Sequence, residues 1–506
     1  MSVQRVKPSN TEWPLFDATQ TQRIELRERA GLPPHTLMAR AGDAVARLAL
    51  AVAPHAQRVC VAAGPGNNGG DGLEAAALLC RSGRQVEVSF LGDATALPED
   101  ARAALARAQA AGVRILTQTG ASAFVAKLGT HDIAIDALLG IGATRPPQGA
   151  IAESIRQLNA LACTVLAVDV PSGLHAGTGQ PLGVACVVAT HTLSLLTLKP
   201  GLFTGVGRDH AGAVWFDALD VDSHADQPDA WLSASEAGAA SSTVRRHAQH
   251  KGSFGDVAVV GGAPGMAGAA LLAARAAHAA GAGRVFVEML GGEALALNLD
   301  PLRPELMFRH GWTQRAAQTL AQSTVVCGCG GGDAVRASLP RLLSLAARLV
   351  LDADALNALA ADSSLATLLL ARAGRHFGTV LTPHPLEAAR LLGGTTAEVQ
   401  ADRLSAARSL ADRFQCVVVL KGSGSIVAAP RQTARINATG NASLASAGTG
   451  DVLAGWLGGR WAQRASAEPF TVAIHAVAEH GAAAQLQSHG PMRASDLIEV
   501  MHRRLG

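Results

Sequence analysis

The sequence contains no tyrosine, and aromatic residues make up only 3% of its 506 positions. This scarcity excludes base-stacking platforms for nucleic acids and every mechanism that needs a tyrosine hydroxyl. Charged residues are also few, at 16%, and the formal net charge is only +3, with no run of lysine and arginine. We therefore expect no nucleic-acid partner, because such partners are bound by concentrated positive charge.

Cysteine is scarce as well: there are seven, an odd number, and only Cys327 and Cys329 lie close together. No cluster of His and Cys completes a zinc site around them, so we expect buried small residues rather than disulfides. Long apolar runs are missing: the first residues lack a signal-peptide core, and residues 173–198 are interrupted by Gly, Gln, Thr and His. These features predict a soluble, cytoplasmic protein without a membrane partner.

What the sequence does contain is short β-branched runs alternating with Ala- and Leu-rich stretches, at a hydrophobic content of 48%. Continuous apolar strands separated by helices are typical of parallel sheets covered on both faces. The predicted strands are Arg58–Ala62, Gln85–Leu91, Asp132–Asp136 and Thr164–Asp169 in the first half, and Asp256–Val260, Arg284–Glu288, Thr324–Cys327, Arg348–Asp352, Gly378–Thr382 and Cys416–Leu420 in the second.

An acidic segment, residues 217–236, separates the two halves and contains neither Lys nor Arg. It shows no strand or helix period until its end, so we interpret it as an inter-domain connection. The sequence therefore predicts two domains, 1–225 and 226–506. The predicted fold class is α/β, with two three-layer α/β/α domains built on mostly parallel sheets.

The first strand of this pattern runs into a loop of glycines, amides and one carboxylate, residues 64–72, before a helix predicted at Leu73–Arg81. Residues 64–69 match G-x-G-x-x-G, but Glu87 lies inside the next strand rather than at its end, which argues against an ordinary dinucleotide fingerprint. Glycines at a helix N-terminus admit a phosphate, and asparagine offers oxygens to a cation and N–H donors to a ligand. The alternative is a tight turn capped by Asp71.

Carboxylates follow two further strands, at Asp136 and Asp169. The carboxyl ends of parallel strands meet at one edge of the sheet, where ligands bind. Either carboxylate alone could be a helix cap. Oxygen ligands of this kind suit a hard cation, so the edge is also a candidate cation site.

GPGNNGGDGL, DALLGIG, DVPSGL and KPGLFTGVGRDHAG occur in this order, and together they resemble the NAD(P)H-hydrate epimerase family. The resemblance implies a Rossmann-like fold that interconverts the R and S epimers of 6-hydroxylated NAD(P)H, with Asp169 in acid–base work at C6. It implies potassium bound by Asn68, Asp136 and Ser172. The chain departs from the family pattern at Ala39, where Glu is common. The residues implied to contact the hydrate are Asn67, Asn68, Gly69, Gly70, Asp71, Gly140, Ile141, Gly142, Ala143, Thr144, Arg145, Pro146 and Asp169.

The second half carries Gly448-Thr449-Gly450-Asp451 before an apolar helix. Backbone N–H groups at a helix N-terminus stabilise developing negative charge, and an adjacent Asp can take a proton from an attacking hydroxyl. This arrangement favours phosphoryl transfer without a Walker loop. A helix cap explains Asp451 equally well in isolation, and His384 alone fits a turn histidine. Asp352 and Asp354 are either a metal-linked pair or helix caps.

HKGSFGDVAVVGGAPGMAGAA, LDADALN, LTPHPLEAARLLG, KGSGS and NATGNASLASAGTGDVLAG together resemble the NAD(P)H-hydrate dehydratase family, which has a ribokinase-like fold. The resemblance implies dehydration of the S-hydrate with Mg²⁺ and with ADP or ATP, ADP being favoured. Cys329 stands where the family usually has Pro. The implied hydrate contacts are Ala269, Gly330, His384 and Asp451, and the implied nucleotide contacts are Lys421, Gly422, Ser423, Gly424, Ser425 and Gly450.

The combined prediction is a bifunctional enzyme that repairs hydrated nicotinamide coenzymes. Its expected partners are NADHX, NADPHX and ADP, and the resemblance suggests a homo-oligomer. In the mechanism that we expect, Asp451 takes the proton of the C6 hydroxyl, which attacks the terminal phosphoryl group. The alternative function is a vitamin or sugar kinase of ribokinase fold, fused to a nucleotide-binding domain without catalytic activity.

Overall fold

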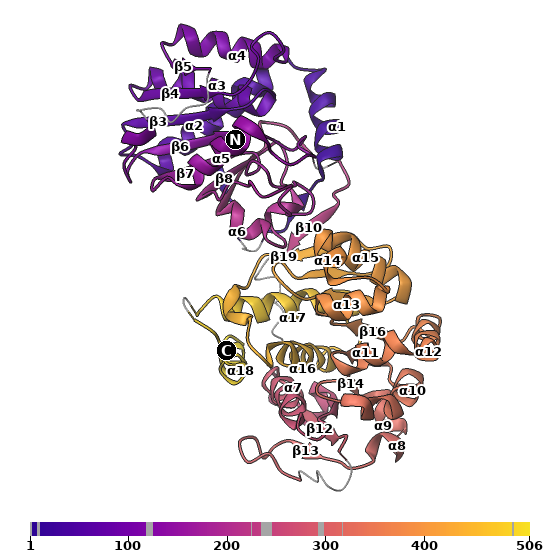
Figure 1. Cartoon of the computed structure of the whole chain (residues 1–506). Coiled ribbons are helices and arrows are strands. Elements are labelled where there is room, and N and C mark those ends of the chain that lie inside the picture. Colours follow the sequence, from indigo (N-terminus) through magenta and orange to yellow (C-terminus); the bar gives the residue numbers. More distant parts are fainter. Residues whose placement is uncertain are drawn as a thin grey trace. The chain divides into compact units, whose positions relative to one another are not determined.

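The computed structural model describes residues 3–7, 11–117, 125–223, 225–233, 245–291, 298–315, 317–487 and 490–505 (Figure 1). It divides into two compact units, one formed by residues 1–7 and Trp13–Ala230, the other by residues 8–12 and Trp231–Gly506. The chain thus passes from the first unit to the second at residue 230, five residues beyond the boundary expected from the sequence at 225. The limits of the functional domains stay a prediction.

The sheet of the first unit has the strand order β1-β9-β8-β7-β6-β3-β4-β5. Neighbouring strands are parallel except for β1 and β9, which are antiparallel. The strands of this unit are β1 (Gln4–Arg5), β2 (Trp13–Leu15), β3 (Arg58–Ala63), β4 (Gln85–Phe90), β5 (Arg114–Leu116), β6 (Ile133–Ala137), β7 (Thr164–Val168), β8 (His191–Leu195) and β9 (Ala213–Asp217). Its helices are α1 (Ala18–Arg29), α2 (Thr36–Val52), α3 (Asn67–Arg81), α4 (Glu99–Ala110), α5 (Gly149–Asn159) and α6 (Gly207–Ala211).

Alternate side chains of each central strand enter separate cores on the two faces of this sheet, because successive strand residues point in opposite directions. Val59 and Val61 of β3 belong to the core shared with α2 and α3. Ala62 belongs to the core on the other face, with Ile155 and Leu158 of α5. Both faces of the sheet are therefore buried. This explains why its strands are apolar at consecutive positions instead of alternating between apolar and polar residues.

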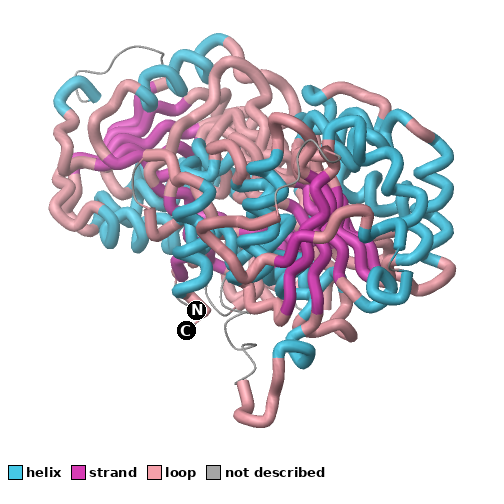
Figure 2. Tube along the Cα trace, turned by 90° about the horizontal axis from the view of Figure 1, so that it is seen from below, coloured by secondary structure: helices cyan, strands magenta, loops and turns pink. Residues whose placement is uncertain are grey.

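The sheet of the second unit runs in the order β13-β12-β11-β14-β15-β16-β17-β18-β19, with parallel pairing as far as β17 and antiparallel pairing from β17 to β19. Figure 2 shows strands, in magenta, lying side by side with helices, in cyan, next to them. The strands are β10 (Ala230–Ser233), β11 (Asp256–Gly261), β12 (Arg284–Met289), β13 (Met307–Phe308), β14 (Thr324–Cys327), β15 (Arg348–Leu351), β16 (Gly378–Leu381), β17 (Val417–Leu420), β18 (Ile426–Ala428) and β19 (Ala434–Asn437). The helices are α7 (Ala267–Ala279), α8 (Trp312–Arg315), α9 (Ala317–Gln322), α10 (Val335–Leu345), α11 (Asp354–Ala361), α12 (Ser363–Ala373), α13 (Pro385–Leu392), α14 (Thr396–Ala401), α15 (Arg403–Phe414), α16 (Thr449–Ala462), α17 (Pro469–Ala484) and α18 (Ala494–Arg503).

Helices α7 and α16 pack in very close contact because α16 presents glycines to its neighbour. A Cβ atom at Gly455 would lie 2.0 Å from the Ala273 carbonyl oxygen, and one at Gly459 would lie 2.4 Å from the Ala277 carbonyl oxygen. Trp456 of the same helix is fully buried and donates from Nε1 to Glu479 of α17 at 2.6 Å. The start of α16 is therefore held at a fixed separation from α7.

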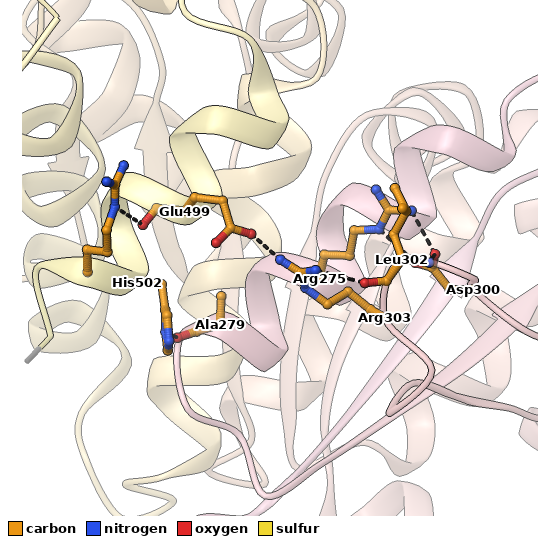
Figure 3. Close-up of polar contacts among 8 residues, drawn as sticks. Arg275, Ala279, Asp300, Leu302, Arg303, Glu499 and His502 are labelled. Atoms are coloured by element: carbon orange, nitrogen blue, oxygen red, sulfur yellow. Dashed lines mark hydrogen bonds and ion pairs between the residues drawn. The ribbon is translucent and has the colours of Figure 1, made fainter.

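The C-terminal helix α18 is fastened to the end of α7 and to the turn around residue 302 (Figure 3). His502 Nδ1 lies 2.9 Å from the Ala279 carbonyl oxygen, and Arg303 forms an ion pair with Glu499. Arg275 of α7 donates two hydrogen bonds, of 2.7 and 2.8 Å, to the buried carboxylate of Asp300. These contacts join three segments that are distant in the sequence.

The predicted fold class is confirmed: each unit is an α/β structure with a mostly parallel sheet. All ten predicted strands are present within about two residues of their expected ends. One expectation is wrong, because α3 begins at Asn67 rather than at Leu73, so the amides and glycines after residue 66 form the start of the helix instead of a loop. None of the helices in the described ranges is long and apolar enough to cross a membrane.

The glycines at the start of α3 are required by close packing, which is why helix-breaking residues stand inside a helix. A Cβ atom at Gly69 would lie 2.0 Å from the Gly64 carbonyl oxygen. We predict that Gly69→Ala lowers the free energy of unfolding of the full chain by about 1–3 kcal/mol. The added Cβ would clash with the backbone of Gly64, which cannot move aside as a flexible side chain could. Gly31→Ala is the matched control, since its Cβ would approach nothing nearer than 3.7 Å. Denaturant unfolding measures both, and equal stabilities would contradict the prediction.

Candidate functional site

The first unit contains a cavity of about 880 Å³ at the carboxyl edge of its sheet. Its walls come from α1, α2, the first turn of α3, and the loops after β6 and β7. Gly69 and Gly70 do not line it, because they face the protein interior: a Cβ atom at Gly70 would lie 2.6 Å from Met38 Cε. The residues expected from the sequence that do line the cavity are Asn67, Asn68, Asp71, Gly140, Ile141, Gly142, Ala143, Thr144, Arg145, Pro146 and Asp169.

Asp169 is held by a fully buried lysine. The residue follows β7 directly and has a φ of 68°, a left-handed conformation that is uncommon for a residue with a side chain. Its carboxylate forms an ion pair with Lys199, whose ammonium also donates to the carbonyl oxygens of Leu195 and Thr197 at 2.7 and 2.9 Å. Lys199 thus fixes the Asp169 carboxylate at the edge of the cavity.

Asp136 and Ser172 are in direct contact beneath the cavity. The Ser172 hydroxyl donates to Asp136 Oδ1 at 2.6 Å, and the Ser172 backbone N–H donates to Oδ2 at 2.8 Å. Burial raises the pKa of Asp136 to about 6, against the lowering effect of the Ser172 hydrogen bonds. Asn68 lies beside Gly140, where a Cβ atom would approach its side chain at 3.3 Å. Its Nδ2 atom is buried and has no hydrogen-bond partner within the described part of the chain.

Two further carboxylates, Glu25 of α1 and Asp71 of α3, line the same cavity. Burial, followed by the charge of Asp169, raises the pKa of each, and for Asp71 the pKa lies well above its ordinary value. Glu25 was missed at the level of the sequence, since α1 is a polar helix with no motif to mark it. Ala39, the departure from the family pattern in α2, is exposed and does not line the cavity.

In the second unit, Asp451 lies in the first turn of α16, whose N-cap Gly448 has a φ of 87° and provides no side-chain cap. Burial and the charge of Asp352 raise the pKa of Asp451 to about 6, while the Cys329 thiol donates a hydrogen bond to its carboxylate. The Sγ atom of Cys329 and one carboxylate oxygen each from Asp352 and Asp451 lie within 4.8 Å of one another. The fold therefore brings the Gly448–Asp451 motif close to Asp352, which follows the end of β15.

Lys421 connects this carboxylate cluster to the loop after β17. Its Nζ donates to Asp352 Oδ1 at 2.6 Å, and a Cβ atom at Gly450 would lie only 3.2 Å from that Nζ. Burial opposes the charge of Lys421, but Asp352 and Glu387 outweigh it and raise the pKa of the lysine. Asp354, by contrast, accepts the backbone N–H of Gly332 at 2.8 Å, so the two aspartates have different partners.

His384, for which the sequence offered a hydrate contact or a turn histidine, is the N-cap of α13. Its Nδ1 accepts the backbone N–H groups of Leu386 and Glu387 at 3.1 and 3.2 Å, which leaves the proton on Nε2. That Nε2 lies 3.2 Å from the carboxylate of Glu387. Burial raises the pKa of Glu387 to about 7.

The remaining expected residues lie in α7, after β14 and after β17. A Cβ atom at Gly330 would lie 2.9 Å from the Cβ of Ala269, so these two residues are neighbours. Residues 421–425 form the turn between β17 and β18, with a φ of 133° at Gly422 and 60° at Gly424. The buried guanidinium of Arg403, which no motif indicated, donates to the Lys421 carbonyl oxygen at 3.1 Å and fixes the turn.

Two α/β units, each with buried carboxylates where parallel strands end, define a two-domain enzyme with two separate centres. Residues 34–201 match the family described as YjeF-related protein N-terminus, and residues 257–503 match the family described as NAD(P)H-hydrate dehydratase. The chain is 36% identical to the bifunctional NAD(P)H-hydrate repair enzyme Nnr of Escherichia coli (strain K12), over 99% of this chain and 95% of that protein. The corresponding Coxiella burnetii enzyme is 35% identical, over 96% of this chain and 98% of its own length.

Among solved structures, the ADP/ATP-dependent NAD(P)H-hydrate dehydratase of Bacillus subtilis, co-crystallised with ATP and Mg²⁺, aligns with a TM-score of 0.42 and 29% identity. That alignment covers 52% of this chain and 92% of the Bacillus protein. The chain belongs to the family of bifunctional NAD(P)H-hydrate repair enzymes, which carry an epimerase domain and a dehydratase domain. The alternative of a vitamin or sugar kinase is not favoured by this membership.

The pairing of Lys199 with Asp169 makes a stability prediction. Lys199→Met leaves the Asp169 carboxylate without its cation, which should lower the free energy of unfolding of the first unit by about 3 kcal/mol. The double variant Lys199→Met/Asp169→Asn should recover most of that loss, because the uncompensated charge is gone. Denaturant unfolding of the full chain measures the cycle. Equal destabilisation in the single and double variants would contradict the prediction.

Proposed function

We propose that the first unit epimerises the R and S forms of NADHX and NADPHX, and that the second dehydrates the S form to NAD(P)H. The observation that carries the proposal is the position of Asp451, in the uncapped first turn of α16 beside the Lys421–Asp352 pair. A carboxylate there can accept a proton while free backbone N–H groups face developing negative charge. ADP is favoured as the phosphoryl donor, and ATP is the alternative.

The proposed dehydration balances without a further reactant. Asp451 takes the proton of the C6 hydroxyl, whose oxygen attacks the terminal phosphorus of ADP as the bond to AMP breaks. The C6–O bond of the resulting ester then breaks with the help of the N1 lone pair, and phosphate leaves. Loss of a proton from C5 gives NAD(P)H. Phosphorylation thus converts hydroxide, a poor leaving group, into a good one.

The nucleotide would lie along the turn at Lys421, Gly422, Ser423, Gly424 and Ser425 and against Gly450. The hydrate would contact Ala269, Gly330, His384 and Asp451. Two observations support this assignment: Lys421 and Gly450 are in contact, and Gly330 lies against Ala269. The side chain of His384 is 46% exposed, so its ring can contact a ligand while Nε2 faces the Glu387 carboxylate.

Mg²⁺ fits the chemistry of this site. The carboxylates of Asp352 and Asp451 lie close together, and Glu387 adds a third acidic group beside Lys421. Burial, followed by the charge of Asp352, raises the pKa values of Asp451 and Glu387, and a bound cation would favour their ionised forms. Asp352 would hold the ion, which would supply positive charge to the phosphates, and Asp451 would stay free to accept the proton.

Potassium fits the first unit in the same way. Asp136 is fully buried, and within the described residues its hydrogen-bond donors are Ser172 and the backbone of Leu138, neither of which is cationic. We assign the ion to Asn68, Asp136 and Ser172, which would offer it oxygen ligands. The hydrate would lie above them, along Asn67, Asn68, Asp71 and Gly140–Pro146, with Asp169 as the base. Cytoplasmic location and assembly into a homo-oligomer stay predictions.

The dehydratase assignment is tested with Asp451→Asn in the full chain. Incubation with mixed hydrates, Mg²⁺, K⁺ and ADP should recover NADH, followed by its dihydronicotinamide absorbance, at a rate at least about 100-fold below that of the unmodified chain. Interconversion of the epimers should continue. Asp333→Asn is the matched control, because that side chain is fully exposed in the second unit. Near-normal turnover in Asp451→Asn would overturn the assignment.

The same assay has a predicted pH dependence. Asp451 acts as a base only when ionised, and its pKa is raised to about 6. The dehydration rate should therefore fall as the pH decreases through about 6 and be steady above it. A rate that rises with acidity over this range would contradict the role.

The potassium site is tested by thermal unfolding at two pH values. Because the pKa of Asp136 in the fold is about 6, above its ordinary value, its stabilising contribution is complete at low pH and lost as the pH rises through 6. Bound K⁺ should offset that loss, so replacing NaCl by KCl should raise the Tm of the first unit at about pH 8 and hardly at about pH 5. Asp136→Asn should remove the difference. An equal response in the variant would contradict the site.

A further inference from the structure

The cavity of the first unit contains more acidic groups than one acid–base residue requires. Glu25, Asp71 and Asp169 all line it, and Asp100 lies at its edge with Arg29. Lys199 is committed to Asp169 and to two backbone carbonyls. Carboxylates that share a site cannot all remain ionised, so at least one of them holds a proton.

Helix α1 places Glu25 firmly in this cavity. Asp17 caps the helix through the Gln20 backbone N–H at 2.7 Å, and the Thr21 hydroxyl is hydrogen-bonded to that of Thr197 at 2.7 Å. Gln22, one position after that bond, approaches the wall formed by residues 140–146, since a Cβ atom at Gly142 would lie 4.0 Å from its Nε2. Glu25 follows one turn later on the cavity side, whereas Glu28 does not line the cavity.

Of the two extra acids, Glu25 is better suited than Asp71 to give up a proton. Burial raises the pKa of Glu25, and Asp169 and Asp100 raise it further, while Arg29 and Lys199 lower it. The pKa of Asp71 lies well above the ordinary value, because burial is followed there by the charges of Asp169, Glu25 and Glu74. Arg29 and Lys199 both favour the ionised form of Glu25, whereas Lys199 is the cation that favours the ionised form of Asp71, so Glu25 gives up its proton more readily.

We propose that Glu25 is a second catalytic residue of the epimerase, the acid that protonates ring nitrogen N1 while Asp169 accepts the proton of the C6 hydroxyl. The inference rests on the epimerase function proposed above. Ring opening needs two proton transfers, one to N1 and one from the C6 hydroxyl. The proposal assigns the first to Glu25 in its protonated form and the second to Asp169 in its ionised form. Lys199 keeps the Asp169 carboxylate in its place for the first of them.

The step balances without an oxidant or a co-reactant. The hydroxyl proton passes to Asp169, the C–O bond becomes a carbonyl, and the C6–N1 bond breaks with its electron pair on N1. Glu25 gives N1 its proton, so that the product is an open-chain aldehyde. Rotation about the C5–C6 bond presents the other face of the aldehyde. N1 then attacks C6, its proton returns to Glu25, and Asp169 returns a proton to oxygen to give the other epimer.

The test uses the full chain with mixed hydrates, Mg²⁺, K⁺ and ADP, and it resolves two phases of NADH recovery. The S form is dehydrated directly, and the R form is recovered only after epimerisation. Glu25→Gln should leave the amplitude and rate of the first phase unchanged and slow the second by about 100-fold or more. Glu28→Gln, on the same helix, is the matched control. Glu25→Asp should retain part of the rate, because it keeps a carboxyl group.

A pH profile distinguishes proton donation from a structural role. In the unmodified chain the second phase should slow as the pH rises and Glu25 loses its proton, and Glu25→Gln should lack this alkaline decline. If Glu25→Gln kept both the normal rate of the second phase and its decrease at high pH, the role of Glu25 would be overturned. The epimerase function would still stand, provided that the unmodified chain shows both phases. Recovery of only the S fraction by the unmodified chain would instead overturn the epimerase function itself.

The site of protonation is tested with water labelled in its oxygen, without nucleotide. Ring opening keeps the original oxygen on C6, so most of the epimerised hydrate should be unlabelled when it is analysed by mass spectrometry. Entry of one solvent oxygen in every epimerisation would overturn protonation at N1, because rapid ring closure leaves hydration of the open-chain aldehyde to label only a minor part of the product.

Discussion

Compensation of buried carboxylates by a single lysine is the constraint on which both centres depend. In the first unit Lys199 is fully buried against Asp169, and in the second Lys421 donates to the buried Asp352. A buried carboxylate without a cation is costly, so each pair fixes two strand ends with respect to each other. Burial, followed by the charge of the paired aspartate, raises the pKa values of the neighbouring acids Glu25 and Asp451. The same electrostatic arrangement thus supports the fold and prepares groups for proton transfer.

Both centres also use a helix that begins on glycine. Gly66 before α3 and Gly448 before α16 provide no side-chain cap, so the first backbone N–H groups remain available to a ligand. Helix α13 shows the contrast, because His384 satisfies two of its N–H groups. The uncapped helices α3 and α16 can therefore bind a ligand through their first backbone N–H groups, whereas the capped helix α13 contributes the side chain of His384 instead.

The sequence predicts the strands and the strand-end residues well because both follow from local pattern. Asp136 and Asp169 close β-branched runs, and parallel strands bring such ends to one edge. The partner of Asp169 could not be predicted, since Lys199 lies 30 residues away and only the crossover through β8 brings it near. Glu25 belongs to a polar helix without a motif. The sequence placed the start of α3 too late, because glycine is uncommon inside helices. Here Gly69 and Gly70 are needed for close packing against Gly64 and Met38, a contact that local helix propensity does not reveal.

The glycine contacts between α7 and α16 have a consequence for how the second centre fails. Asp451 stands on a helix whose backbone touches that of α7, so no side chain can yield to let the two separate. Distortion of the reactive geometry then requires the whole helix pair to come apart. Heating should therefore leave this centre competent until the surrounding unit melts, and loss of turnover should coincide with the cooperative transition instead of preceding it.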